Sequence, residues 1–171
     1  PHGEGSMAAL ISSDFSKLDN LLNMVKKIGV CEIANHNSSE QIVISGHTKA
    51  VQELVNNSDK FSIKRAVLLN VSAPFHCSLM MPAQIKLENE LKEITFNDPD
   101  LPIICNYTAV AENNPLKLKE NIISQVTNKV RWKETMEYAL DKKINKVLEC
   151  GSGKVLSGLF KRFSKDFNVY N

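Results

Sequence analysis

His76 is the residue of this sequence best placed for acid–base chemistry. It lies in the segment 69–80, which follows an apolar, strand-like run and precedes a helix-like pattern. Loops in that position commonly present catalytic groups from a rigid support. A neutral imidazole can take the proton of a hydroxyl nucleophile when its other ring nitrogen is held as a donor. A loop histidine is also often purely structural, so position alone leaves both interpretations open.

The four cysteines do not form a metal-binding pattern. Cys31, Cys77, Cys105 and Cys150 lie far apart, with no C-x-x-C pair and no histidine partner that would complete a zinc knuckle. We therefore expect four reduced thiols in a cytoplasmic protein, and no metal site.

Charge and hydropathy argue against nucleic-acid and membrane partners. Lys and Arg (21) nearly balance Asp and Glu (19), which leaves a formal net charge of +2 at pH 7. Binding to nucleic acid or to an anionic membrane would need a local patch instead. The longest apolar run, residues 7–11, is far shorter than the ~20 residues of a spanning helix or the ~7 of a signal peptide. The sequence predicts a soluble, unexported protein.

Residues 6–69 have the element order of a ferredoxin-like subdomain. Apolar runs predict strands at 7–11, 30–34, 41–45 and 65–69, with a polar turn over 35–40. Apolar residues recur at helical spacing over 15–25 and again from about Thr48, and Ser13 or Asp14 could cap the first helix. The predicted order is βαββαβ.

Residues 70–171 form a second region, in which helices alternate with short apolar strands. The spacing predicts helices over 87–94, over 115–126 with Asn114 as the cap, over 132–140 and over 155–163. Strands are predicted at 101–106 and 146–149, with an edge strand at 167–170. The alternation is typical of a mainly parallel sheet flanked by helices. Three short strands make a thin core for such a sheet. We therefore expect part of the sheet to lie outside this sequence.

Five ordered segments resemble the malonyl-CoA:acyl carrier protein transacylase family. They are residues 5–11, 35–46 (Asn-His-Asn-Ser-Ser-Glu-Gln-Ile-Val-Ile-Ser-Gly), 71–77 (Val-Ser-Ala-Pro-Phe-His-Cys), 125–132 and 149–159. The segment 71–77 looks like the catalytic histidine motif of the family. The segment 149–159 is similar to its closing Glu-x-Gly-Pro-Gly-Lys-Val-Leu-x-Gly-Leu. The resemblance covers almost the whole chain.

The resemblance implies an α/β fold, with a hydrolase-like, parallel-sheet acyltransferase core into which the ferredoxin-like βαββαβ subdomain is inserted. It implies transfer of a malonyl group from coenzyme A to the phosphopantetheine thiol of acyl carrier protein, through a serine ester, in fatty acid biosynthesis. His76 would be the general base and acid, and the backbone carbonyl of Gln125 would orient its ring. Malonyl-CoA would be the substrate, and no permanently bound cofactor is implied.

Three features of the family have no counterpart in this sequence. The serine elbow, the carboxylate-binding arginine and the oxyanion motif all precede the small subdomain in the family, and none occurs here. Ser152 matches the closing turn and is expected to be a turn residue. The sequence also begins with Pro1 rather than Met. The chain therefore resembles the C-terminal half of the enzyme. It is expected to be inactive alone and to need the N-terminal half as a partner.

The resemblance also points to substrate-binding residues. Phe75 resembles the form seen in malonyl-selective domains, where its ring would restrict the room for a branched acyl group; ordinary packing is an equally good interpretation. Asn35 and Asn37 match positions near the cleft between the subdomains, where amides could bind a pantetheine arm. Asparagines also favour turns, which is the role we expect here.

Lys161 and Arg162 belong to a basic stretch, residues 142–171, in which Lys and Arg outnumber Asp and Glu. Acyl carrier proteins are acidic, so this surface could steer their approach. A solvated helix face is the competing interpretation. The alternative for the whole chain is a binding module, either an inactive acyltransferase remnant or a free-standing ferredoxin-like domain. A metal or nucleic-acid protein has little support.

Overall fold

The computed structural model describes residues 3–171, and the chain begins with a four-stranded antiparallel sheet. The strands are β1 (Gly5–Ile11), β2 (Cys31–Ser38), β3 (Gln41–His47) and β4 (Arg65–Leu68), in the order β2-β3-β1-β4. Helices α1 (Leu18–Val25) and α2 (Thr48–Asn57) and the 3-10 turn η1 (Ser58–Phe61) connect them. The predicted ferredoxin-like arrangement is confirmed, because β1 lies between β3 and β4 and each pairing is antiparallel.

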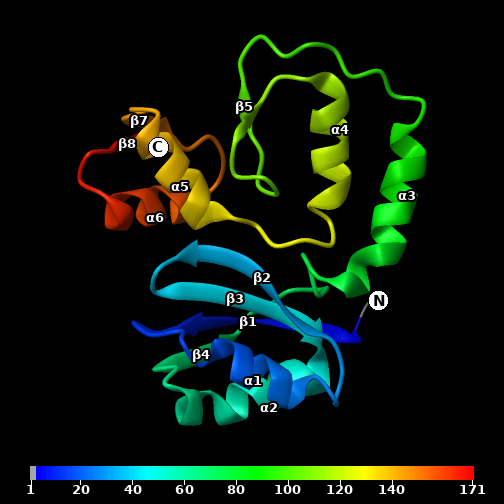
Figure 1. The fold of residues 1–171 in the computed structure, drawn as a ribbon, viewed down its shortest axis with the longest axis vertical. Coiled ribbons are helices and arrows are strands. Elements are labelled where there is room, and N and C mark those ends of the chain that lie inside the picture. The colour runs from blue at the N-terminus through cyan, green and yellow to red at the C-terminus, as the bar shows by residue number, and fades with distance from the viewer. Residues whose placement is uncertain (1–2) are drawn as a thin grey trace.

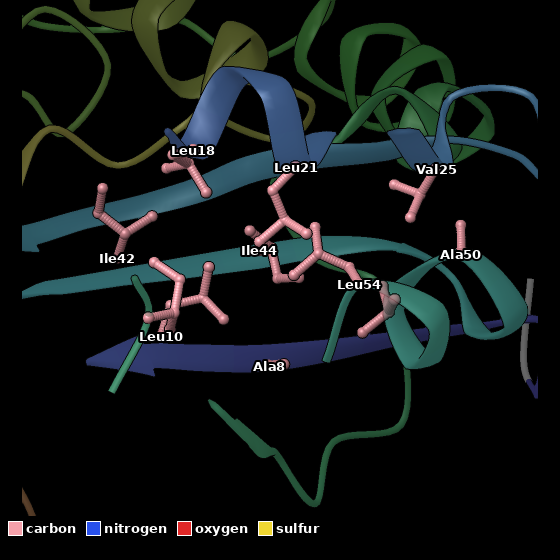
Figure 2. Packing of buried hydrophobic residues seen from close by; sticks show 11 residues of the cluster. Ala8, Leu10, Leu18, Leu21, Val25, Ile42, Ile44, Ala50 and Leu54 are labelled. Atoms are coloured by element: carbon pink, nitrogen blue, oxygen red, sulfur yellow. The ribbon is translucent and has the colours of Figure 1, made fainter. Parts of the chain in front are cut away.

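Helices α1 and α2 cover one face of this sheet (Figure 1), and the main hydrophobic core lies between these helices and the sheet. Side chains alternate along a strand, so Leu10 of β1 and Ile44 of β3 both point to the helices, as Figure 2 shows. Burial of each such side chain stabilises the fold by about 1.5–3 kcal/mol. The buried members are Ala8, Leu10, Leu18, Leu21, Val25, Ile42, Ile44, Ala50, Val51, Leu54 and Ile63.

The opposite face of the sheet carries a smaller cluster and faces the rest of the chain. Its buried members are Met7, Ala9, Ala34 and Val43, with Leu69 packed against them. Main-chain bonds tie the two regions together at the edge strand β2. The His36 amide donates to the carbonyl of Val130 at 2.9 Å, and the Val130 amide donates to the carbonyl of Ala34 at 2.8 Å.

The residues after β4 form helices and two short strand pairs. The elements are the 3-10 turn η2 (Ser78–Met80), α3 (Met81–Leu91), β5 (Ile103–Ile104), β6 (Ala111–Glu112), α4 (Pro115–Ser124), α5 (Trp132–Asp141), β7 (Lys146–Leu148), α6 (Val155–Phe163) and β8 (Asn168–Tyr170). Strands β5 and β6 are antiparallel, and β7 and β8 are parallel. Within residues 3–171 these two pairs do not join into one sheet.

An aromatic cluster holds the C-terminal elements together. Phe160 of α6 lies edge-on to Trp132 of α5 and to Phe167, with ring centroids 5.7 Å and 4.9 Å apart. Met136 is fully buried beside them. Edge-to-face contacts of this kind stabilise a core by about 0.5–1.5 kcal/mol beyond their buried area. This cluster packs α5 against α6.

Several predicted boundaries are wrong. Helix α1 begins at Leu18 with Lys17 at its N-cap, so neither Ser13 nor Asp14 caps it; Asp14 Oδ1 instead accepts from the Ser16 amide at 2.8 Å. Helix α3 starts at Met81 and ends at Leu91, rather than spanning 87–94. The predicted strand 101–106 shrinks to Ile103–Ile104. Other boundaries are confirmed, among them the Asn114 cap, whose Oδ1 accepts from the Leu116 and Lys117 amides.

The predicted turn over 35–40 is also wrong. Strand β2 runs to Ser38 and β3 starts at Gln41, so only Ser39 and Glu40 form the turn. Asn35 and Asn37 therefore lie in a strand. Their turn propensity is overridden because the β2 backbone is paired, with bulges, to β3 on one side and to Val130 on the other.

No helix within residues 3–171 has the length and apolar character required to cross a membrane.

Candidate active site

The loop between β4 and η2 holds His76 in an unusual backbone conformation. The φ angle of His76 is +60°, which is the left-handed region that residues other than glycine rarely adopt. A residue in such a conformation costs of order 1–3 kcal/mol, which surrounding contacts must offset, and such residues cluster at functional sites. The side chain of His76 is half-buried.

A main-chain carbonyl fixes the orientation of the His76 ring. Nδ1 of His76 lies 2.8 Å from the carbonyl oxygen of Gln125, the residue directly after α4. A carbonyl only accepts, so Nδ1 carries the hydrogen, and in the neutral ring Nε2 keeps its lone pair. Nε2 is thus the ring atom that could take a proton from a nucleophile. This is the contact that the resemblance implied for His76 and Gln125.

Residues on both sides of His76 are anchored in the sheet. Pro74 is fully buried and packs on Gly5 of β1, where an added Cβ would lie only 2.3 Å from Pro74 Cγ. Cys77 is also fully buried, and its Sγ donates to the carbonyl of Pro74 at 3.1 Å. The loop is therefore a rigid support rather than a mobile segment.

Burial makes the nearby thiols poor candidates for the nucleophile. It raises the pKa of the Cys77 thiol, and it raises that of Cys31 to about 12. A thiol must ionise to react, so both stay inert at neutral pH. Within residues 3–171, no group of three or more His, Cys, Asp or Glu side chains is placed to hold a metal ion.

Comparison with known proteins identifies what this geometry resembles. No protein-family model matches the chain. The sequence is 38% identical, over 162 residues, to malonyl CoA-acyl carrier protein transacylase from Escherichia coli, and the match covers 95% of this chain and 52% of that enzyme. The fold matches the acyl-carrier-protein-S-malonyltransferase from Bartonella henselae with a TM-score of 0.92 at 43% identity, covering 99% of this chain and 54% of that one.

The chain is similar to about half of a malonyl CoA-acyl carrier protein transacylase. A further match, with a TM-score of 0.93 and 34% identity, is a malonyl-transacylase in complex with its type II PKS acyl-carrier protein; it covers 99% of this chain and 55% of that one. The resemblance found from the sequence motifs and the predicted α/β fold class are both confirmed. The chain spans about half the length of the transacylases that it matches.

The other residues that the transacylase resemblance singled out take no part in the His76–Gln125 hydrogen bond. Asn35 and Asn37 are half-buried in β2, and Asn35 forms an isolated bridge with Val130. Phe75 is 39% exposed. Lys161 and Arg162 are exposed in the last turn of α6. Within the described part of the chain, the structure brings together only His76 and Gln125 from this set by side-chain hydrogen bonding.

The sequence analysis missed one cluster of charged and polar side chains in this chain. Nδ1 of His36 lies 3.6 Å from Oε2 of Glu134, and Arg131 Nε contacts Oε1 of the same carboxylate at 3.3 Å. Burial lowers the pKa of His36, although the Glu134 carboxylate opposes that shift. Arg131 also donates to the carbonyl of Thr108 at 3.1 Å. The cluster joins β2, α5 and the β5–β6 connection.

Proposed function

We propose that this chain provides the histidine base of a malonyl-CoA:acyl carrier protein transacylase. The observation that carries the proposal is the contact between His76 and Gln125, because it leaves Nε2 as a proton acceptor on a rigid loop. In this proposal residues 6–69 are the small subdomain and residues 70–171 are part of the acyltransferase core. The serine nucleophile belongs to the portion of the fold that this chain does not match.

The proposed reaction has two half-reactions with one proton carrier. The serine Oγ attacks the malonyl thioester carbonyl while Nε2 of His76 takes the hydroxyl proton; the C–S bond then breaks, and the imidazolium returns the proton to the coenzyme A sulfur. In the second half, Nε2 takes the proton of the carrier-protein thiol. The thiol sulfur attacks the carbonyl of the serine ester, the ester C–O bond breaks, and the imidazolium returns the proton to the serine oxygen. Serine and imidazole supply this chemistry, so no permanently bound cofactor is required.

Four apolar side chains of residues 70–171 are largely exposed in this chain. Leu101, Leu116, Leu148 and Val155 are 75%, 69%, 65% and 71% exposed. These side chains lie on α4, β7, α6 and the segment before β5, where a further part of the fold could cover them. The relatives are about twice as long as the matched region, so we propose that the other half of the transacylase fold covers this surface.

A chimeric enzyme tests the proposed function. In the Escherichia coli relative, the matched half would be replaced by these 171 residues. We expect the chimera to transfer malonyl from malonyl-CoA to acyl carrier protein, and we expect no transfer by the 171-residue chain alone, because its imidazole has no serine to activate. A folded chimera that binds carrier protein without transferring malonyl would favour the binding-module alternative. A malonyl-serine ester on the isolated chain, detected by mass spectrometry, would also contradict the proposal.

Docking of acyl carrier protein gives a second prediction. The carrier protein is acidic, so Lys161 and Arg162 should speed its encounter with the enzyme. In the chimera, K161A/R162A should lower kcat/KM for carrier protein by about 3–10-fold at low salt, and the difference should fade as salt rises. The matched control is K26A/K27A, which removes the same charge from exposed residues at the end of α1. Equal, salt-insensitive rates for the two double variants would end the docking assignment.

A further inference from the structure

Glu32 is the side chain that holds the segment directly after His76. Its carboxylate accepts two hydrogen bonds from Ser78, one from the main-chain amide to Oε2 at 2.8 Å and one from the hydroxyl to Oε1 at 2.7 Å. Glu32 lies near the start of β2, whereas Ser78 is the first residue of η2. Hydrogen bonds to an ionised carboxylate are shorter and stronger than neutral ones, so this pair fixes Ser78 on the sheet.

A second contact from the neighbouring strand holds Cys77. Ser45 of β3 stands directly opposite Glu32 in the β2–β3 register, and its hydroxyl contacts Cys77 Sγ at 3.6 Å. Residues opposite each other in an antiparallel pair point to the same face, which here is the face away from α1 and α2. Two adjacent side chains of the sheet thus hold the two residues that follow His76.

This anchoring bears on His76 because its ring is bonded to a different part of the fold. The main chain of His76 belongs to the loop that packs on the four-stranded sheet. Its ring is hydrogen-bonded to the carbonyl of Gln125, which follows α4. The 2.8 Å contact between Nδ1 and the carbonyl is made with the loop in the left-handed conformation, with the φ angle of His76 at +60°. We expect loss of the Ser78 anchor to weaken this loop conformation and, with it, the contact between the ring and its acceptor.

We propose that Glu32 is a positioning residue, which holds His76 in the Nδ1–H tautomer through Ser78. The inference rests on the proposed function only where it concerns the rate of malonyl transfer. Its structural half, the link from the Glu32 carboxylate to the His76 ring, is a property of the 171-residue chain and can be measured there.

The first experiment reads the tautomer of His76 in the isolated chain by long-range ¹H–¹⁵N NMR, with H76N identifying its signals. We expect the unchanged chain to show a protonated Nδ1 and E32A to shift the ring toward the Nε2–H form. E32Q can keep one of the two bonds and should fall between them. The matched control is E40A, an exposed glutamate at the turn of the same hairpin, which should leave the tautomer unchanged. An unchanged Nδ1–H signature in a folded E32A chain would overturn the inference.

A milder variant covers the case in which E32A does not fold. S78A removes the hydroxyl bond and keeps the main-chain bond to the carboxylate, so it should move the tautomer in the same direction by a smaller amount. In E32A/S78A the shift should equal that of E32A alone, because both changes break one link. Additive shifts, or no shift in S78A, would contradict the proposed route.

The chimeric enzyme gives the kinetic test. E32A should lower kcat for malonyl transfer about 10- to 100-fold with little change in KM for malonyl-CoA, because misplacing a catalytic group by about 1 Å has effects of that size. E40A should retain the full rate. If H76N leaves transfer unchanged, the proposed function fails; if H76N abolishes transfer while E32A keeps both the rate and the tautomer, only the role of Glu32 fails.

Discussion

Replacement of His76 by asparagine is expected to lower malonyl transfer by the chimeric transacylase about 10²–10⁴-fold, which is the usual contribution of a positioned acid–base group. The serine hydroxyl would lose the group that takes its proton, and the departing coenzyme A thiolate would lose the group that protonates it. Single-turnover formation of the malonyl-serine ester measures the first loss directly. A rate within about threefold of the unchanged chimera would remove His76 from the proposed mechanism.

Asparagine and alanine differ in a way that separates chemistry from backbone strain. Asparagine tolerates the left-handed region better than other residues with a side chain, so H76N suits the φ of +60°. Alanine lacks the polar side chain that relieves this conformation. Both variants should lose transfer equally, whereas H76A should unfold at lower urea than H76N. If H76A transferred malonyl more slowly than H76N in proportion to its lower stability, His76 would act by stabilising the fold and not by accepting a proton.

The ferredoxin-like part of the fold was predictable because its physics is local. Alternating apolar residues such as Ala8, Leu10, Ile42 and Ile44 mark strands with one buried face, and helical spacing marks α1 and α2. Where the prediction failed, tertiary pairing overrode residue preference. Asn35 and Asn37 have turn propensity, yet β2 continues through them because β3 and Val130 pair with its backbone.

The second region was harder to predict because its strands are short and its contacts join residues that are far apart in the sequence. Two-residue strands such as Ile103–Ile104 leave almost no periodicity to detect. The family motifs nevertheless pointed to the histidine loop and to Gln125. The motifs carried no trace of the bond between Glu32 and Ser78, whose residues are 46 positions apart. Nor could they reveal the His36–Glu134 contact, since sequence spacing does not encode which surfaces of two subdomains meet.

The core of the small sheet gives the prediction with the largest expected effect on stability. Leu54 of α2 is fully buried against the sheet, among the side chains that Figure 2 shows. Leu54→Ala removes buried apolar atoms and leaves a cavity, so it should lower the free energy of unfolding of the chain by about 2–5 kcal/mol. Equilibrium unfolding in urea, followed by circular dichroism, measures that loss as a lower midpoint at an unchanged slope.

An exposed leucine of the same chain serves as the control. The tautomer signal of His76 in Leu54→Ala then shows whether the His76 site depends on this core. Leu116 at the start of α4 is 69% exposed, so Leu116→Ala should change the free energy of unfolding by no more than about 0.5 kcal/mol. The His76 loop is anchored on the opposite face of the sheet that Leu54 supports, so in Leu54→Ala the His76–Gln125 tautomer signal should disappear at the same urea concentration as the sheet. A His76 signal that outlasts the loss of the sheet would mean that α4 alone holds the ring, and the small subdomain would then have no part in placing the base.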